Sequence, residues 1–339
     1  MKIGLTYDLR EDYNIAQDSE VFADFCHPDE IGYLSRAIEA NGHQAVMLGN
    51  MYKLNEAIRE KRFDCDLVFV EDEGIASRNR EAIVPALLEL NKIPYVGSDA
   101  YAIGLSQNKY HTKLVAQSLG IPMPKDVYIP YGTEYGEIPK ALCKGMEQAG
   151  IGFPIVVKPN CEGYSMGVFL ANNLKEATEK VIANFENYHQ EVLCEEYIEG
   201  QELYVPVIGS GRESRCLGTG RCTYLDGSNF TIFSLKDKCF TPLKDSMAEL
   251  PESVQKGLFR WSLELHNHLG CRDFSRSDFR MGKDGPCFLE INPRPGLTEN
   301  GPFETCGKSL GMTYVQVIGK IIDSAVKRYP QLQKLSSPQ

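Results

Sequence analysis

The chain has 339 residues, of which 42% are hydrophobic and 24% charged, and its formal net charge is −10. This length is enough for about two or three cores, and the acidic balance argues against a nucleic-acid or anionic-membrane partner. The 11 cysteines show no C-x-x-C or zinc-ligand spacing, so we expect free thiols in a reducing cytoplasm. No apolar stretch approaches the ~20 residues of a membrane span, and no signal-peptide core precedes Asp8.

Short apolar runs alternate with helical patterns over residues 1–98, which predicts a parallel sheet with helices on both faces. The expected strands cover residues 3–7, 45–48, 67–70 and 95–96, and the expected helices cover residues 30–40, 54–61 and 80–90. Right-handed crossovers would make this unit Rossmann-like. It has no G-x-G-x-x-G after its first strand, which argues against dinucleotide binding.

A second unit is expected over residues 99–198. It begins with a predicted helix at 105–119 that ends at Gly120, and strands follow at 154–159, 166–171 and 191–198. Asn173 is a candidate N-cap for the helix after the second of these strands, with Glu176 as its capping-box partner.

The third unit is expected over residues 199–335. Its predicted elements are strands at 202–208 and 215–218, a polar irregular segment at 224–242, an amphipathic helix at 251–269, strands at 271–281 and 286–291, and a final helix at 313–326. The fold class that follows is α/β, with α+β character in the C-terminal half.

The most informative segment is Asp278-(x₁₁)-Glu290-x-Asn292, on two predicted strands joined by a tight turn. Glu290 and Asn292 are two residues apart on one strand, so they face the same way. Such hard oxygen ligands suit Mg²⁺ or Mn²⁺ better than Zn²⁺. Arg276 lies two residues before Asp278 and could compensate developing negative charge.

A solvated acidic face on a surface hairpin is the alternative interpretation. However, Glu290 follows Phe288 and Leu289 and precedes Ile291. A carboxylate in so apolar a setting needs a counter-charge, and this favours the metal site.

Two lysines and a loop indicate phosphate binding. Lys158 ends an apolar strand, and the glycines of the following loop, residues 161–167, let backbone N–H groups approach a phosphate. Lys109 lies in a helical pattern, where most lysines are solvated. Residues 195–202 could offer backbone groups to adenine and a carboxylate to ribose, although taken alone they equally fit a charged loop.

Together these segments resemble the D-alanine–D-alanine ligase-like branch of the ATP-grasp superfamily. The residues that carry the resemblance are Ile155-Val156-Val157-Lys158-Pro159 with Glu162-Gly163-x-Ser165-x-Gly167, Glu195-x-x-Ile198-x-Gly200-x-Glu202, Arg276-x-Asp278, and Leu289-Glu290-x-Asn292-x-x-Pro295-Gly296-Leu297-Thr298. Residues 94–98 and Lys109 also match, so the resemblance spans almost the whole chain. It implies an ATP-grasp fold: a Rossmann-like N-terminal domain (1–98), a central ATP-grasp domain (99–198) and a C-terminal ATP-grasp domain (199–335).

The resemblance also implies roles for individual residues. Those expected to bind ATP are Lys109, Lys158, Glu162, Gly163, Glu195, Glu196, Tyr197, Ile198, Glu202, Lys236 and Leu289. Asp278, Glu290 and Asn292 would hold two Mg²⁺ ions, or Mn²⁺ in their place. The expected catalytic residues are Arg276, Tyr164 and Ser165, and the expected substrate-binding residues are Glu73 and Gly296.

The implied reaction is an ATP-dependent joining of a small-molecule carboxylate to an amine. The carboxylate attacks the γ-phosphorus to form an acylphosphate, and the amine then displaces phosphate. We expect a cytoplasmic enzyme with no nucleic-acid or membrane partner. The resemblance is also compatible with a homodimer.

The chain departs from the family pattern on the substrate side. Tyr164 stands where the family has a catalytic serine, Glu73-Gly74 replaces a His-Gly pair, Gly301 replaces a serine, and residues 7–13 lack the family's Gly-rich segment. The acidic run 71–73 would suit an amine-bearing or cationic group, or it merely solvates a loop. We therefore predict a divergent acceptor site and an amine other than D-alanine.

Three alternatives stay open at this point: a true D-alanine–D-alanine ligase, a non-catalytic ATP-binding module, and an ATP-grasp carboxylase or kinase. The metal residues and phosphate lysines are complete, which disfavours a non-catalytic module. Nothing in the sequence demands the biotin or bicarbonate machinery of a carboxylase.

Overall fold

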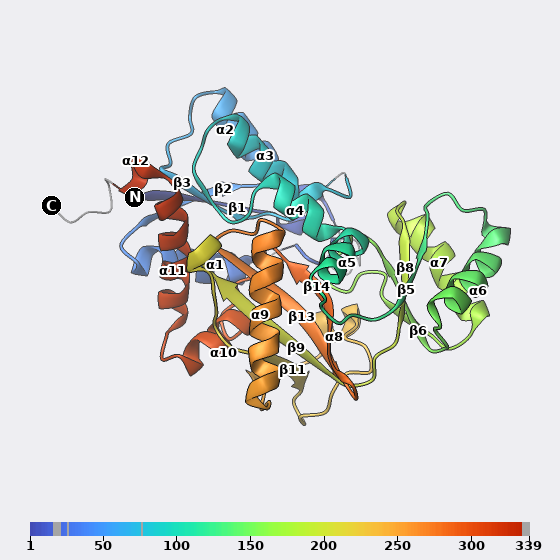
Figure 1. Cartoon of the computed structure of the whole chain (residues 1–339). Coiled ribbons are helices and arrows are strands. Elements are labelled where there is room, and N and C mark those ends of the chain that lie inside the picture. The colour runs from blue at the N-terminus through green and yellow to red at the C-terminus, as the bar shows by residue number, and fades with distance from the viewer. Residues whose placement is uncertain (16–21, 26, 76, 334–339) are drawn as a thin grey trace.

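The computed structural model describes residues 1–15, 22–25, 27–75 and 77–333, and of residues 239 and 240 only the backbone. Three sheets organise this part of the chain (Figure 1). One lies within residues 2–96, one within 126–196 and one within 201–292. No helix among these residues is long and apolar enough to cross a membrane.

The first sheet is parallel, as predicted, with the strand order β2-β1-β3-β4. Its strands are β1 (Lys2–Tyr7), β2 (Gln44–Gly49), β3 (Leu67–Glu71) and β4 (Tyr95–Val96). Alternate residues of β3 enter two different cores, since successive side chains of a strand point to opposite faces. Helices α2 (Met51–Arg59) and α3 (Ile83–Leu90) cover one face, and α1 (Pro28–Ala40) packs on the other.

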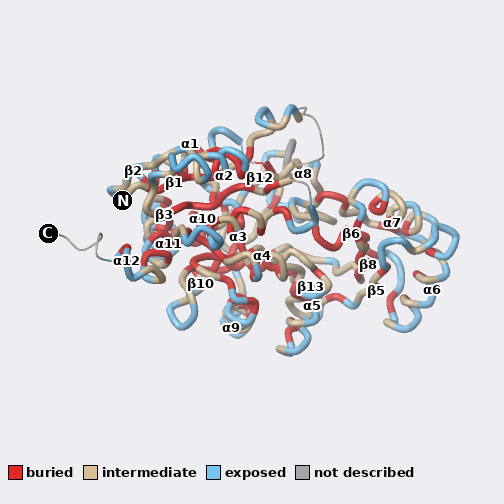
Figure 2. Tube along the Cα trace, turned by 90° about the horizontal axis from the view of Figure 1, so that it is seen from above, coloured by how far each residue is buried: buried red, intermediate tan, exposed pale blue. Residues whose placement is uncertain are grey.

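The second sheet is antiparallel, with the order β5-β8-β6-β7. Its strands are β5 (Asp126–Ile129), β6 (Ile155–Pro159), β7 (Phe169–Ala171) and β8 (Val192–Glu196). Helices α6 (Ile138–Ala149) and α7 (Leu174–Tyr188) build a core on one face of this sheet. Figure 2 shows that their outer sides are exposed whereas the strands beneath are buried. The opposite face, which carries Lys158 and Glu195, is therefore free to line a cavity.

The third sheet is six-stranded and antiparallel. Its strands are β9 (Gln201–Ile208), β10 (Arg215–Cys216), β11 (Gly220–Tyr224), β12 (Leu243–Met247), β13 (Phe274–Gly282) and β14 (Gly285–Asn292). Helix α9 (Glu252–His268) covers one face through the predicted apolar stripe, together with α5 (Lys109–Ser118). We propose that the domain boundaries fall near residues 98 and 198, between the sheets.

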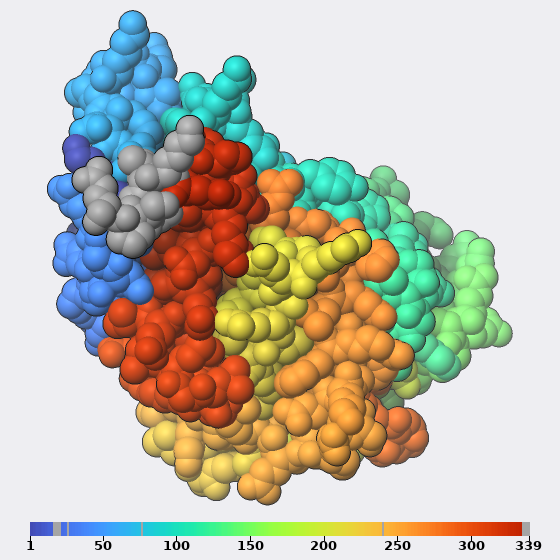
Figure 3. Space-filling model, turned by 60° about the vertical axis from the view of Figure 1, so that its left-hand side comes forward, coloured from blue at the N-terminus to red at the C-terminus, as the bar shows by residue number. Residues whose placement is uncertain are grey.

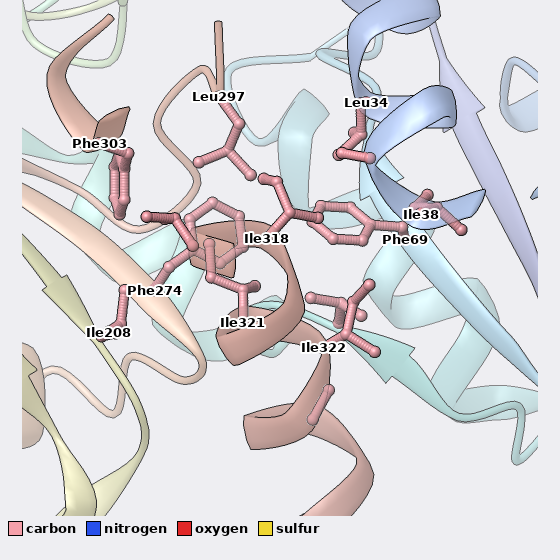
Figure 4. Packing of buried hydrophobic residues seen from close by; sticks show 14 of the residues in the cluster. Leu34, Ile38, Phe69, Ile208, Phe274, Leu297, Phe303, Ile318, Ile321 and Ile322 are labelled. Carbon is pink, nitrogen blue, oxygen red and sulfur yellow. The ribbon is translucent and has the colours of Figure 1, made fainter. Parts of the chain in front are cut away.

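The helix at the C-terminal end joins the first sheet to the third. Helix α11 (Tyr314–Arg328) begins at the N-cap Thr313, close to the predicted start. Its residues Ile318, Ile321 and Ile322 pack between Phe69 of β3 and Phe274 of β13 (Figure 4). Figure 3 shows the same segment, in red, against the N-terminal residues in blue. One face of the N-terminal sheet thus packs against a helix more than two hundred residues further along the chain.

Several sequence-based expectations need correction. The helix expected at 105–119 is two helices, α4 (Ala100–Gln107) and α5, because Asn108 leaves the helical conformation and caps α5 by accepting from His111 N. The segment 224–242 is not wholly irregular, since Ser234 and Asp237 form a capping box that starts α8 (Leu235–Phe240). Strands β11 and β12 and helices α10 (Pro302–Ser309) and α12 (Pro330–Gln333) have no counterpart in the prediction.

The caps and strand ends were predicted more closely. Asn173 caps α7 as expected by accepting from Glu176 N. The Glu176 side chain, however, accepts from the backbone N–H of Asn172, one residue before the expected partner. Strand β7 begins at Phe169 rather than at 166, because the preceding residues belong to a loop.

Candidate active site

A cavity of about 500 Å³ is lined by residues from all three sheets. With one exception, Lys236, every site residue expected from the sequence lines this cavity. The fold thus brings together side chains that lie more than two hundred positions apart in the chain. Their roles stay predictions, and their contacts show what each can do.

The hairpin of β13 and β14 places the expected metal ligands side by side. Asp278 is paired with Glu290, and Arg276 with Asn292, in the register of the two strands. The register then shifts by one residue, so that Leu289 has no partner on β13. This bulge lets both Leu289 and Glu290 line the cavity.

The carboxylate of Asp278 is held on both sides. Arg276 donates from Nε to Oδ1 and from Nη2 to Oδ2, each at a distance of 2.7 Å. Asn292 Nδ2 donates to Oδ2 at 3.0 Å. Burial raises the pKa of Asp278, and the Arg276 guanidinium opposes that shift. A bidentate, charge-assisted pair of this kind fixes the orientation of both groups.

Glu290 is surrounded by lysines. Its Oε2 lies 3.2 Å from Lys109 Nζ, which also donates to the carbonyl oxygen of Glu162 in the phosphate loop. Burial disfavours the Glu290 carboxylate, yet three nearby lysines outweigh burial and lower its pKa to about 2. Glu290 is therefore ionised at neutral pH and available as a ligand.

A buried triad holds the second phosphate lysine. Glu195 is 3% exposed, and its carboxylate lies 2.6 Å from Lys158 Nζ and 2.9 Å from Lys113 Nζ. Burial disfavours the charged form of Glu195, but the two lysines outweigh it and lower its pKa. Glu195 was expected beside adenine, whereas its contacts are those of a counter-ion that positions Lys158.

The cavity continues between the central and C-terminal sheets. Tyr197, Ile198 and Glu202 line it here, as the prediction of an adenine and ribose site requires. The Arg280 guanidinium lies over the Tyr197 ring, 5.4 Å from its centroid. It also donates to the Glu202 carboxylate and to the carbonyl oxygen of Phe230, each at 2.8 Å. This arginine rigidifies the wall that carries Glu202.

The loop 161–167 covers the middle of the cavity. Tyr164 and Ser165 adopt left-handed backbone conformations, with φ of 53° and 63°. Lys238 of α8 lies over the Tyr164 ring at 5.3 Å and lines the cavity, whereas Lys236 is exposed and does not. The lysine of this segment that faces the site is therefore Lys238.

Another part of the cavity lining is acidic, and residues 1–98 provide most of its carboxylates. Glu73 and Gly296 both line it, as expected for substrate-binding residues. Glu73 Oε2 lies 2.9 Å from Nη2 of Arg294, a buried residue two positions after Asn292. Arg294 thus connects the metal hairpin to the acidic end.

Five cations of the site were missed in the sequence: Arg80, Lys113, Lys238, Arg280 and Arg294. Spacing offers a signal for some of them. Lys113 follows Lys109 by one helical turn, and Arg280 follows Asp278 by two strand positions. Arg80 begins a short 3-10 helix in which no other site residue was expected, and Arg294 lies in the irregular segment after β14.

Comparisons with known proteins identify the family of this chain. The family model described as the D-ala D-ala ligase C-terminus matches residues 115–323, which is more than half of the chain. The chain belongs to the D-alanine–D-alanine ligase family. It is an ATP-grasp ligase, which confirms the predicted family, fold and enzyme class.

Individual relatives show how far this similarity extends. The ligase is 30% identical to the D-alanine–D-alanine ligase of Aromatoleum aromaticum over 300 residues, which cover 87% of this chain and 89% of that protein. A Bacillus anthracis D-alanine–D-alanine ligase complexed with ATP has a similar fold, with a TM-score of 0.73, 20% identity and 99% of each chain covered. The VanG D-Ala:D-Ser ligase of Enterococcus faecalis is similar too, with a TM-score of 0.71, 21% identity and coverage of 96% of this chain and 99% of that one.

Proposed function

We propose that this ligase phosphorylates a small-molecule carboxylate with ATP and joins the resulting acylphosphate to an amine, with release of ADP and phosphate. The observation that carries the proposal is the convergence of Asp278, Glu290 and Asn292 with Lys109 and Arg276 at one cavity. Fixed cations and oxygen ligands in a sheltered site are what phosphoryl transfer requires of a protein.

The nucleotide is assigned to the space between the central and C-terminal sheets. Lys109 and Lys158 would bind its phosphates, and Tyr197, Ile198 and Glu202 its adenosine. Lys238, rather than the exposed Lys236, would reach the phosphates from α8. Glu195 would act through Lys158, because its carboxylate is already held by two lysines.

The donor set fits magnesium. Two carboxylates and an amide oxygen are hard ligands, which suit Mg²⁺. Asp278, Glu290 and Asn292 would hold the ions, with phosphate oxygens completing the coordination. Bound Mg²⁺ would neutralise charge that develops on the phosphate oxygens.

The protein's own groups would then act in a fixed order. Lys109 and Lys158 orient the γ-phosphate so that a carboxylate oxygen attacks phosphorus and ADP leaves. Arg276, already fixed against Asp278, stabilises the oxyanion when the amine nitrogen attacks the acyl carbon and phosphate departs. The loop 161–167 and α8 exclude water, which would otherwise hydrolyse the acylphosphate.

We further propose that the amine is not D-alanine. Tyr164 fills the position where the family has a small serine, and Glu73-Gly74, whose Glu73 pairs with Arg294, stands where the family has a His-Gly pair. The name of the VanG neighbour shows that this fold also occurs in a ligase named for D-serine. The second candidate is a D-alanine–D-alanine ligase, which the names of relatives such as that of Aromatoleum aromaticum favour.

The decisive experiment is a screen of ADP release with amino acids in pairs, combined with product masses. A ligase gives an amide product and one ADP per product. Glu290→Ala should abolish ADP release, whereas a non-catalytic module would release no ADP in either form. Turnover of D-alanine alone at a rate comparable to other pairs would establish the second candidate instead.

A further inference from the structure

Six carboxylate side chains line the end of the cavity nearest the N-terminal sheet. They belong to Asp24, Glu30, Glu71, Glu73, Glu81 and Glu162, and we call this set the acidic pocket. Two buried guanidinium groups, Arg80 and Arg294, pair with members of the set. The carboxylates of the pocket therefore outnumber the arginines that contact them by six to two.

Each arginine is shared among several carboxylates. Arg80 pairs with Asp24 and lies 3.5 Å from Glu162 and 4.0 Å from Glu73. Arg294 Nη2 lies 2.9 Å from Glu73 and 3.4 Å from Glu81. One guanidinium carries one positive charge, so neither can neutralise all of its partners.

An unsatisfied oxygen provides a second and independent observation. The Asp24 side chain is only 7% exposed, and its Oδ1 has no hydrogen-bond partner among the described residues. A buried carboxylate oxygen without a partner is costly. Because Asp24 lines the cavity, a donor on a bound molecule can supply the missing bond.

Two carboxyl groups of the acidic pocket, Glu71 and Glu73, have raised pKa values. Burial raises the pKa of Glu71 to about 8, although the Arg294 charge opposes the shift. Burial likewise raises the pKa of Glu73 well above its ordinary value. Burial is the main cause of both shifts and neighbouring carboxylates add to it, so a cation bound beside these groups would favour their charged forms.

Direct contacts connect the acidic pocket to the reaction centre. Arg80 contacts Glu162 in the phosphate loop, and Lys109 Nζ donates to the Glu162 carbonyl oxygen. The same Lys109 nitrogen lies 3.2 Å from Glu290. The acidic pocket and the expected metal ligands thus line one continuous cavity.

We propose that one substrate of this ligase carries a second cationic group, an ammonium or a guanidinium, and that the acidic pocket binds it. This cation is additional to the amine that forms the bond and to any α-ammonium. The substrate is accordingly a dibasic amino acid or diamine, used as the donor acid or as the attacking amine. The inference rests on the proposed ligase function and specifies the substrate class of the same site.

Isosteric pairs of amino acids test the charge directly. Lysine is compared with norleucine, and arginine with citrulline, in both enantiomers, with ADP release and product mass as readouts. Each amino acid is supplied once as the only substrate and once with a common neutral partner, and product mass shows whether it enters as acid or as amine. We expect kcat/KM to be about 10- to 100-fold higher for the charged member of a pair, the size of one charged hydrogen bond.

Variants assign the preference to the pocket. Asp24→Asn and Glu81→Gln should each reduce the ratio between charged and neutral substrates by about 10-fold. The control is Glu147→Gln, an exposed carboxylate on α6, which should leave the ratio unchanged. Thermal unfolding and ATP binding of every variant show that an altered ratio does not reflect misfolding.

Each outcome bears on one proposal or on both. Turnover of neutral substrates at rates equal to their charged isosteres overturns the cation pocket but leaves the ligase function standing. A charge preference that neither pocket variant alters also overturns it. If no pair of amino acids gives ADP release, the ligase function fails, and the inference that rests on it fails too.

Discussion

Replacing Glu195 with glutamine tests whether its carboxylate positions Lys158 or contacts adenine. The substitution keeps the shape of the side chain but removes the charge that Lys158 and Lys113 share, and Lys113 then retains Asp126 at 2.8 Å. Removing one partner of a buried ion pair costs about 3–5 kcal/mol. Because Lys113 retains Asp126, we expect a loss of about 3 kcal/mol, which for a chain of this length corresponds to a fall in Tm of about 4 °C.

Calorimetry of the nucleotide-free protein at neutral pH measures this loss. Glu186→Gln, an exposed carboxylate on α7, is the matched control and should change Tm by about 1 °C or less. A Glu195→Gln protein that unfolds like the control and loses only ATP affinity would refute the counter-ion role. It would instead support the adenine contact expected from the sequence.

Further predictions concern the site and the core. Lys238→Ala should lower kcat/KM for ATP by about 100-fold in an ADP-release assay; Lys236→Ala should change it by less than about two-fold, and the reverse order would restore Lys236 as the phosphate ligand. Phe274→Ala should lower the free energy of unfolding by about 3–5 kcal/mol in urea titrations, because the ring is fully buried between two sheets, and a loss below about 1 kcal/mol would contradict that packing. The raised pKa of Glu71 contributes stability that is present below its ordinary value of 4.5 and is lost as the pH rises through about 8. The Glu71→Gln variant should therefore show a smaller difference in Tm between pH 6 and pH 9 than the unmodified protein. An unchanged difference would argue against ionisation of Glu71 in that range. Chelation of divalent cations should abolish ADP release, and Mg²⁺ or Mn²⁺ should restore it, whereas activity that persists in EDTA would remove the metal role of Asp278.

Local patterns determined much of the fold. Strand β3 and helix α9 follow directly from their apolar periods, and the hairpin that pairs Asp278 with Glu290 follows from two strand patterns and a tight turn. These features depend on residues near in sequence, so the amino-acid order alone specifies them. The amino-acid sequence also indicated the family, because the family's motifs are short segments of consecutive residues.

Short elements escaped prediction for a related reason. Asn108 divides one helical pattern into two helices, and six residues around Lys238 form a helix within a polar segment. In both places a cap, rather than an apolar period, decides where the helix begins. For this reason Lys236 was expected to bind ATP, whereas in the folded helix α8 it is Lys238 that lines the cavity.

Long-range contacts were decided by tertiary structure alone. The sequence predicted roles for Lys158, Glu195 and the hairpin of Asp278 and Glu290, because each stands at a characteristic place in a strand. It could not show that Lys113 shares Glu195, that α11 completes the N-terminal sheet, or that Arg294 meets Glu73. A buried charge reveals its function only through its partner. In this ligase many partners lie on segments that are distant in the chain, so only the assembled fold determines which cation each carboxylate holds.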